Sequence, residues 1–315
     1  MNSPRRTLCR WLGIALLPVL VAPAETPPPQ PAPQRGGSGP ANNIPGIFGT
    51  ELPDLLNPEN LRLSLRPHFG DFVNHDHFRL DVGLRYALSE RLEFTIGTEA
   101  YVAHGLGDAA FGEKLGLASV EVGAKYRFAQ WLQPYWQTAA GIKYTTPVSR
   151  PPLEFTDAYR NLTPYLTLAH DWRSRPDFTS FLSAGFNVVD RARVTGNPDS
   201  KDFGEHSWFI RPGLLWRRGD IHYTLETVVA STSGFEDAPQ WQFSLRPGIE
   251  WDLPPALKFN ARNRWTIGLG LSLGTGDQGD DVGVNVRIQT DFDFRKFFQR
   301  LPGVGDDPTT TGASR

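Results

Sequence analysis

Charged side chains alternate with apolar ones over long stretches of this 315-residue chain. Residues 78–86 read FRLDVGLRY, and residues 282–289 read VGVNVRIQ. In an extended segment this spacing places guanidinium, ammonium and carboxylate groups on one face and apolar groups on the other. The chemistry that such a face offers is the electrostatic binding and orientation of polar or anionic solutes.

The elements that position these charges are predicted to be β-strands, because the alternation has the period of a strand with two different faces. No segment shows helical periodicity of comparable length. Twelve alternating segments lie near residues 61–72, 76–88, 91–104, 117–129, 132–146, 159–171, 177–189, 205–217, 220–232, 240–252, 264–274 and 281–294. Bacterial outer-membrane barrels have an even number of antiparallel strands. The predicted fold class is therefore all-β, a single antiparallel transmembrane β-barrel of about 12 strands.

The predicted links between these strands alternate in length. Tight links at 89–90, 130–131, 173–176 and 218–219 alternate with longer links at 105–116, 147–158, 190–204, 233–239 and 275–280. Outer-membrane barrels combine short periplasmic turns with longer outer loops. The pattern predicts that both termini are periplasmic, although a short link at 73–75 and a long one at 253–263 depart from it.

The N-terminus carries an export signal by its composition. Residues 1–24 combine arginines, an apolar core and the small-residue site Ala22-Pro23-Ala24, which is the pattern of a cleaved secretory signal peptide. The single cysteine, Cys9, lies within this signal. No disulfide is therefore expected in the mature protein, which we place in the bacterial outer membrane.

The remaining chain is predicted to form one domain with flanking segments. These are a Pro/Gly-rich linker at 25–45, a lead-in or small plug segment at 46–60, the barrel at 61–294 and a C-terminal tail at 295–315. Within the second segment, residues 47–56 are expected to form a short helical piece that either plugs or caps the barrel mouth or packs as an ordered lead-in. The ordered lead-in is the preferred interpretation, because short apolar pieces commonly pack without a function.

Tryptophans bracket the apolar faces of two predicted strands. Trp208 and Trp216 bracket one face, and Trp241 and Trp251 bracket the other. At roughly 3.3 Å per residue and a tilt near 40°, about eight to ten residues span roughly 20 to 25 Å, close to the apolar height of a barrel. We interpret these four residues as a membrane-interface girdle rather than ordinary core filling.

The same two strands share a repeated element, FIRPGLLW at 209–216 and SLRPGIEW at 244–251. A proline inside a strand removes a donor from the hydrogen-bond ladder and is usually confined to edges or bulges. The repeat therefore predicts bends or bulges that help to close the sheet.

With the apolar face outward, the charged face turns toward the lumen. Arg66, Arg246 and Arg287 then fall near mid-depth and could form one basic wall, with Glu99 and Glu121 facing it. The predicted lumen and constriction residues are Arg66, Arg85, Glu99, Glu121, Lys125, Arg211, Arg246 and Arg287. Rings of charged side chains orient solutes in other channels, whereas in a filled lumen such charges only neutralise one another.

A lipid hydrolase is the enzymatic alternative, because some outer-membrane barrels of this size are lipid hydrolases. Their catalysis needs a serine, a histidine and a polar orienting residue on the lipid-facing surface. His170 and Ser180 face outward on neighbouring predicted strands, but no GxSxG element accompanies them, so no catalytic residue is assigned. His75 and His77, with His104 and His206 near outer strand ends, are interpreted as solvated loop histidines, and the acidic loop 277–281 lacks the ordered ligand spacing of a calcium site, so no metal or cofactor is assigned. A formal charge of -2 gives no electrostatic case for nucleic acid.

Two short motifs carry a family resemblance. Gly105-Leu106-Gly107-Asp108, followed by VGAKYRF at 122–128, resembles a pattern of outer-membrane proteins linked to the meta-pathway of phenol degradation. The resemblance covers one loop and one strand. It implies passive transport of hydrophobic or aromatic compounds, with Asp108 shaping an outer loop and Lys125 and Arg127 lining the lumen. The chain departs from a typical barrel ending, because residues 295–315 follow Phe294.

The sequence thus favours a non-enzymatic outer-membrane channel that passes small solutes, including aromatic or hydrophobic compounds, through a charged lumen. A structural or interaction barrel that acts through its outer loops is the second hypothesis, and a lipid hydrolase is the third. Expected partners are membrane lipids, lipopolysaccharide, the solute and the barrel-assembly machinery.

Overall fold

The computed structural model describes residues 50–70, 77–103, 115–128, 135–148, 160–189, 206–233, 240–258, 263–276 and 281–293, all within one compact unit, Pro40–Arg315. These residues form twelve strands: β1 (Asn60–Gly70), β2 (His77–Ala87), β3 (Leu92–Ala103), β4 (Leu115–Arg127), β5 (Trp136–Pro147), β6 (Asn161–Trp172), β7 (Arg175–Val189), β8 (His206–Arg218), β9 (Ile221–Ser233), β10 (Gln240–Asp252), β11 (Arg264–Gly276) and β12 (Asp281–Asp293). A 3-10 turn, η5 (Pro255–Leu257), lies between β10 and β11. Among the described residues, no helix has the length and apolar character needed to cross a membrane.

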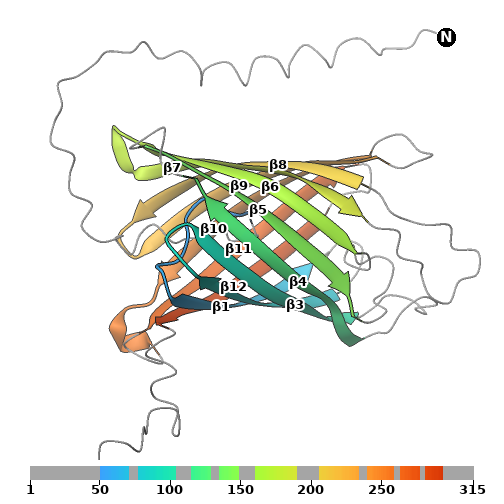
Figure 1. The fold of residues 1–315 in the computed structure, drawn as a ribbon, viewed down its shortest axis with the longest axis horizontal. Coiled ribbons are helices and arrows are strands. Elements are labelled where there is room, and N and C mark those ends of the chain that lie inside the picture. The colour runs from blue at the N-terminus through green and yellow to red at the C-terminus, as the bar shows by residue number, and fades with distance from the viewer. Residues whose placement is uncertain are drawn as a thin grey trace, which may run out of the picture. The chain divides into compact units, whose positions relative to one another are not determined.

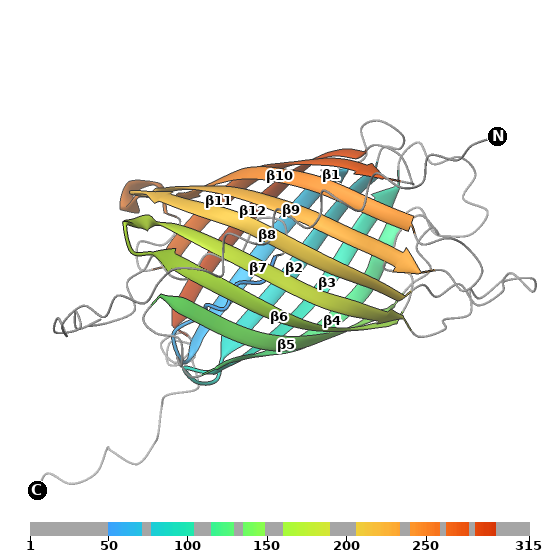
Figure 2. The same ribbon diagram turned by 90° about the horizontal axis from the view of Figure 1, so that it is seen from above.

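The strands close into one antiparallel barrel (Figures 1 and 2). Each strand pairs with its neighbours in sequence, and β12 returns to pair with β1. At this closing pair, called the seam below, Asn60 lies opposite Asp293 and Leu65 opposite Ile288. The predicted fold class, a single antiparallel barrel of twelve strands, is confirmed.

The two ends of the barrel carry different links. At one end, called the turn end below, residues 173–174 join β6 to β7 and residues 219–220 join β8 to β9. Gly219 adopts a φ of 62° in the second of these turns, a left-handed conformation that glycine accepts without steric cost. The first and last strand residues, Asn60 and Asp293, lie at this end as well. The links predicted to be long belong to the opposite end, called the loop end, and lie largely outside the described residues.

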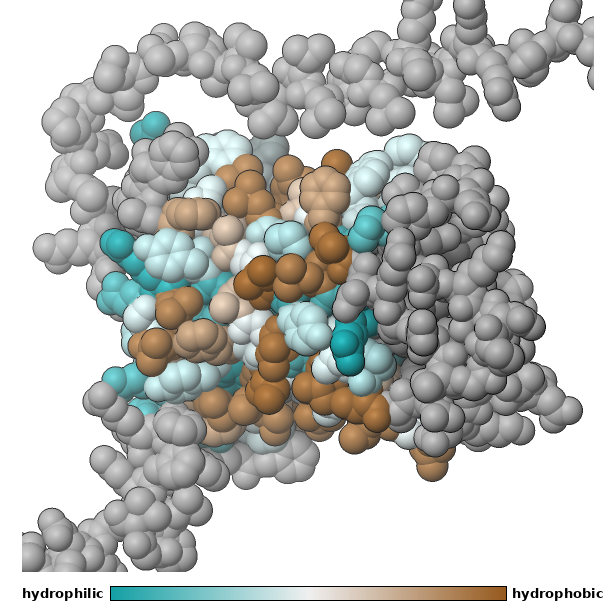
Figure 3. All heavy atoms as spheres, turned by 45° about the vertical axis from the view of Figure 1, so that its right-hand side comes forward, coloured by the Kyte–Doolittle hydropathy of each residue, from teal (hydrophilic) through white to brown (hydrophobic). Residues whose placement is uncertain are grey.

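Alternation divides the strands between an apolar exterior and a polar lumen. On β3, Phe94 and Ile96 are 44% and 50% exposed, whereas the neighbouring Glu93 is 2% exposed. Figure 3 shows hydrophobic side chains spread over the described exterior on the side of the barrel that it views. Contiguous exposed apolar surface on this scale is typical of membrane contact and not of a monomer in water.

Prolines interrupt the hydrogen-bonded ladder without shifting its register. In the pairing of β8 with β9, Ile210 lies opposite Val229 and Gly213 opposite Glu226, so the register is the same on both sides of Pro212. The β10–β11 pair is likewise unshifted across Pro247. In the described pairings the register shifts lie elsewhere, at 99–100 and 171–172. The predicted bulges are therefore absent from these two pairings, whereas a bend at either proline stays a prediction.

Aromatic side chains in the lumen lie against glycines of neighbouring strands. A Cβ at Gly141 would lie 2.3 Å from the hydroxyl oxygen of Tyr165, and a Cβ at Gly213 would lie 2.3 Å from the ring of Phe181. Both rings are buried. The missing side chains on one strand therefore make room for large rings from the next.

Outward-facing aromatic residues gather near the two ends of the barrel. Toward the loop end, the rings of Trp208 and Trp241 meet edge to face at 5.3 Å. Toward the turn end, Trp216 stacks between Phe178 at 5.7 Å and Tyr223 at 5.2 Å. Trp251, 38% exposed, also lies toward the turn end, opposite Ile221.

Candidate functional site

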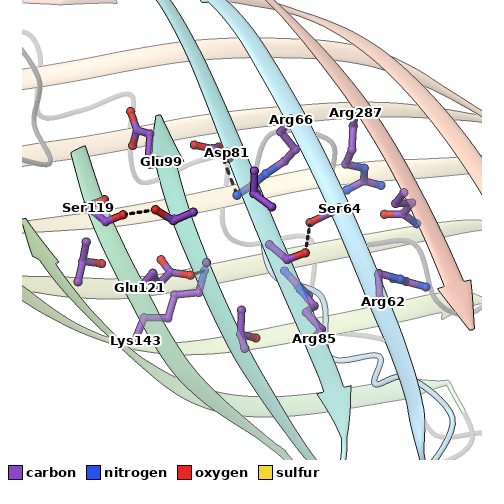
Figure 4. Close-up of a pocket in the computed structure, with 17 residues that line it drawn as sticks. Arg62, Ser64, Arg66, Asp81, Arg85, Glu99, Ser119, Glu121, Lys143 and Arg287 are labelled. Atoms are coloured by element: carbon purple, nitrogen blue, oxygen red, sulfur yellow. Dashed lines mark hydrogen bonds and ion pairs between the residues drawn. The ribbon is translucent and has the colours of Figure 1, made fainter. Parts of the chain in front are cut away.

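A polar cavity of about 170 Å³ lies in the lumen against strands β1 to β5 and β12 (Figure 4). Ser64, Gly83, Gly97 and Glu121 follow one another as register partners across β1 to β4. The two adjacent glycines hollow the wall at this level, since neither carries a side chain into the lumen. The lining includes the hydroxyl residues Ser64, Thr95, Ser119 and Thr145.

The charges around this cavity are held in ion pairs. Arg66 lies 3.4 Å from Asp81, and Lys143 lies 3.1 Å from Glu121. The side chains of Arg66, Asp81 and Glu121 are still about a third exposed, at 34%, 35% and 31%. They are thus the charged groups of these pairs that a solute in the cavity can reach most readily.

The structure brings most of the predicted lumen residues to this cavity. Five of the eight line it: Arg66, Arg85, Glu99, Glu121 and Arg287. Lys125 lies directly below, toward the turn end, with its ammonium 3.2 Å from Glu93. Arg287 also contacts Glu250 of β10.

The other two predicted residues lie elsewhere in the lumen. The Arg211 guanidinium lies 4.3 Å from the centre of the Phe209 ring. The Arg246 side chain donates to the hydroxyl of Ser244 at 2.9 Å, and its register partner on β9 is Glu226. Arg246 is not among the residues that line the cavity, whereas Arg66 and Arg287 are.

Residues 50–56, called the inner segment below, lie inside the barrel. The expected helical piece is wrong for them, because they form no helix, and residues 47–49 lie outside the described part. Thr50 donates to Glu226 of β9 at 2.7 Å, and the backbone N–H of Leu56 donates to Glu93 of β3 at 3.1 Å. Leu52 packs in a small apolar cluster with Ala169, Phe181 and Leu215. The inner segment therefore contacts strands on widely separated parts of the wall.

The carboxylate of Glu51 occupies a cluster of three cations. Arg85 donates to it at 2.8 Å, and the ammonium groups of Lys143 and Lys125 lie 3.1 and 3.7 Å away. Burial alone would favour the neutral acid, but Arg85, Lys143 and Lys125 hold the pKa of Glu51 well below its usual range. Thr167 also donates to the Glu51 carbonyl oxygen at 2.7 Å. Glu51 is thus bound through both its side chain and its backbone.

Lys125 holds the next part of the inner segment through the backbone. Its ammonium group donates to the carbonyl oxygens of Leu52 at 3.2 Å and Asp54 at 2.9 Å. Burial raises the pKa of the Asp54 carboxyl to about 6, although Arg217 opposes that rise. The inner segment thus carries one carboxyl that is held ionised and one that is pushed toward its neutral form.

Sequence reasoning missed the residues of the inner segment as functional residues. The available signal was an acidic side chain, Glu51, directly before the apolar Leu52 and ahead of the first strand. Alternation could not find it, because residues 50–56 form no strand and have no face assigned by a period of two.

The exterior pair considered for a hydrolase is brought together only in part. His170 and Ser180 are register partners on β6 and β7. The His170 ring stacks on Trp136 at 4.3 Å, and the Ser180 hydroxyl accepts a hydrogen bond from Trp172 at 3.3 Å. Both groups are thus engaged with tryptophans near the turn end. Within the described residues, no group of three or more metal-ligating side chains is gathered in one place.

Comparisons with known proteins bear on the fold. No family profile matches the chain, and no curated protein matches it. An outer membrane channel from Pseudomonas putida F1 is similar with a TM-score of 0.50 at 14% identity, covering 76% of this chain and 97% of that chain. The NanC porin gives 0.49 at 8% identity, covering 72% and 98%. The KdgM porin in complex with disordered oligogalacturonate gives 0.44 at 13% identity, covering 73% and 99%. The likeness to the Pseudomonas putida F1 channel, together with the closed strand order, shows that the chain has the fold of an outer-membrane β-barrel, as the sequence predicted.

Proposed function

We propose that this protein is a passive channel for small polar solutes in a bacterial outer membrane. The observation that carries the proposal is a polar, charged cavity enclosed by a closed barrel whose exterior is apolar. A closed barrel leaves no unpaired strand edge in the lipid and can enclose a hydrophilic path. The abundance of charges and hydroxyl groups in the lining favours polar solutes over the hydrophobic compounds that the family resemblance implies.

The proposed constriction lies at the cavity. Arg66, Arg85 and Arg287 supply its basic side, and Glu99 and Glu121 supply carboxylates on β3 and β4. Opposed charges of this kind orient a passing solute and select it by charge. Lys125 supports the constriction by holding the inner segment, whereas Arg211 and Arg246 line the path farther along.

In this proposal the turn end faces the periplasm, so both termini of the barrel are periplasmic and the long links face outward. Trp208 and Trp241 then form part of an outer aromatic girdle, and Trp216 and Trp251 part of an inner one, where indole rings favour the lipid interface. Residues 1–24 act as the cleaved export signal. The outer loops contact lipopolysaccharide, and the barrel-assembly machinery inserts the chain.

The inner segment acts as a plug in this proposal. It reaches β9 through Thr50 and β3 through Leu56, so it crosses the lumen on the turn-end side of the cavity. Solute passage then requires that the segment move. A lumen filled in this way also supports the second candidate, a barrel that does not transport and acts through its loops.

Single-channel conductance of a variant without residues 51–56 separates these two candidates. A channel should conduct more in this variant than in the parent protein. Removing Arg66 should then reduce its preference for anions, because Arg66 lines the cavity, whereas Arg246→Ala removes a luminal arginine outside it and serves as the matched control. A folded variant without conductance would exclude the channel and leave the loop-based role.

A further inference from the structure

The cation cluster around Glu51 has the composition of a carboxylate-binding site that is already occupied by the chain itself. Arg85, Lys125 and Lys143 face three carboxylates, those of Glu51, Glu93 and Glu121. Withdrawal of Glu51 would leave three cations against two carboxylates on the barrel wall. An uncompensated buried charge is strongly unfavourable, so the vacated site would favour another anion.

The site is open to the cavity on one side. Arg85 and Lys143 line both the cavity and the binding site of Glu51, and their side chains are 15% and 20% exposed. Lys125, at 3%, closes the far side. A solute in the cavity can therefore approach the cations that hold Glu51 without first passing the inner segment.

The size and lining of the cavity limit the ligand. The cavity measures about 170 Å³ and opens into the lumen. Four hydroxyl side chains, those of Ser64, Thr95, Ser119 and Thr145, line it beside the charges. The matching ligand is a small acid with several hydroxyl groups, because its hydroxyls replace hydrogen bonds to water while its carboxylate pairs with the cations.

Resting on the proposed channel function, we propose that Glu51 is an internal ligand and that the carboxylate of a small hydroxy acid takes its place between Arg85 and Lys143. The exchange removes the Glu51 carboxylate attachment, one of several contacts that hold the inner segment, and so raises the fraction of protein with an open lumen. The solute thus opens its own path. Neutral polyols of the same size lack the charge that the cluster requires and leave the segment in place.

Competition with a tethered group sets the concentration range. Glu51 is tethered to the barrel by its own chain, and a tethered group acts with an effective concentration on the order of millimolar. Free gluconate should therefore displace it at about millimolar concentration or above. Glu51→Gln removes the competing carboxylate. The half-saturating gluconate concentration should then fall, because the cation site is already free of the Glu51 carboxylate before gluconate binds.

The test uses protein expressed from the full-length sequence and purified from outer membranes. A Leu52→Cys variant is labelled with a thiol reagent, since Leu52 is 4% exposed while the inner segment is bound. Gluconate should raise the labelling rate, and sorbitol should not. Sodium chloride at equal ionic strength controls for screening, and an equal effect of chloride would overturn the proposal.

Conductance in planar bilayers gives the second readout. Gluconate should raise the conductance of the parent protein, and at lower concentration that of Glu51→Gln. The matched control is Glu90→Gln, which removes the same charge from an exposed turn and should behave as the parent.

The outcomes distinguish the two proposals. If the variant without residues 51–56 conducts but gluconate changes neither labelling nor conductance, the channel stands and the carboxylate exchange is wrong. If gluconate releases the segment but no variant conducts, the exchange stands and the channel function is wrong. Equal half-saturating concentrations for Glu51→Gln and the parent would show that Glu51 does not compete.

Discussion

At the scale of residues, the lumen is organised by carboxylates that several cations share. Glu93 lies 3.2 Å from Lys125 and 3.7 Å from Arg85, and its side chain is 2% exposed. Such groups are mutually dependent, because removal of one partner leaves the other charge buried without compensation. Single substitutions here should therefore cost more stability than substitutions of both partners together.

The pair of Arg62 and Asp291 at the seam tests this dependence. The Arg62 guanidinium donates to the two carboxylate oxygens of Asp291 at 2.5 and 2.6 Å, with side-chain exposures of 4% and 13%. Arg62→Leu should lower the free energy of unfolding by about 3 to 5 kcal/mol, since it leaves a buried carboxylate unpaired.

The double variant Arg62→Leu/Asp291→Leu should recover much of that loss, because neither charge remains. Urea unfolding in lipid vesicles measures both effects. If the double variant lost as much free energy of unfolding as the two single variants together, Arg62 and Asp291 would not act as a unit.

Asp54 should give the inner segment a pH dependence. Its pKa is raised to about 6 in the bound segment, so its contribution to binding is complete below its ordinary pKa of 3.8 and is lost as the pH rises through about 6. The pKa of Glu51 is shifted in the opposite direction, so its contribution to binding of the segment is lost only as the pH falls below the ordinary value of 4.5. Conductance should therefore rise between pH 5 and about 7.5.

The charged groups that face Asp54 are Arg217, Asp171, Lys125 and Arg127. Asp54→Asn should abolish the rise in conductance, since the amide does not titrate. An unchanged pH profile in this variant would assign the effect to another group.

At the scale of elements, glycine and aromatic residues fit together across neighbouring strands. Gly141→Ala should place a methyl group against Tyr165, where an added Cβ would meet the ring at 2.3 Å. Overpacking of this kind costs about 1 to 3 kcal/mol. Gly97→Ala is the matched control, because the nearest atom to its Cβ is 3.4 Å away.

Urea unfolding of the two variants provides the measurement. Equal stability of Gly141→Ala and Gly97→Ala would mean that Tyr165 moves aside without cost. A loss confined to Gly141→Ala would show that the ring is fixed by the packing described here.

The elements themselves could be predicted from the sequence because alternation specifies both a strand and its faces. The predicted segment 205–217 became β8 (His206–Arg218), and 240–252 became β10 (Gln240–Asp252). Pairing partners followed from the order of the strands, since an up-and-down barrel joins sequential neighbours. The bulges expected at Pro212 and Pro247 are absent, because a strand can lose one donor and keep its register on both sides of the proline.

The candidate site was less predictable. Strand order and alternation placed Arg66, Arg287 and Glu121 in the lumen, and all three line the cavity. Which ion pairs they form depends on how far each side chain extends and on how neighbouring strands are staggered. The alternation of apolar and polar residues gives neither. Residues 50–56 have no periodic pattern, so their position inside the barrel follows from long-range contacts such as that of Thr50 with Glu226.

At the scale of the whole molecule, a continuous sheet surrounds a short non-strand segment. The barrel closes through strand pairs alone, and the inner segment takes part in none of them. Deletion of residues 51–56 should therefore leave the folded barrel intact but lower its thermal stability, because the cations lose the Glu51 carboxylate.

Electrophoretic mobility of unheated samples in detergent should be that of the folded form, with the shift to the unfolded form at a lower temperature than in the parent. Loss of the folded form at all temperatures would mean that the inner segment is required for closure.

The seam has a consequence for the order of folding events. Arg62 and Asp291 are 229 positions apart in the sequence, whereas the other strand pairs join sequential neighbours. The entropy lost on closing a loop grows with its length, and contacts of high sequence separation slow folding. The hairpins can form during insertion, but the circle can be completed only when the last strand arrives. Until then the sheet is open between β1 and β12. Residues 50–56 can therefore bind to its inner face before the barrel closes.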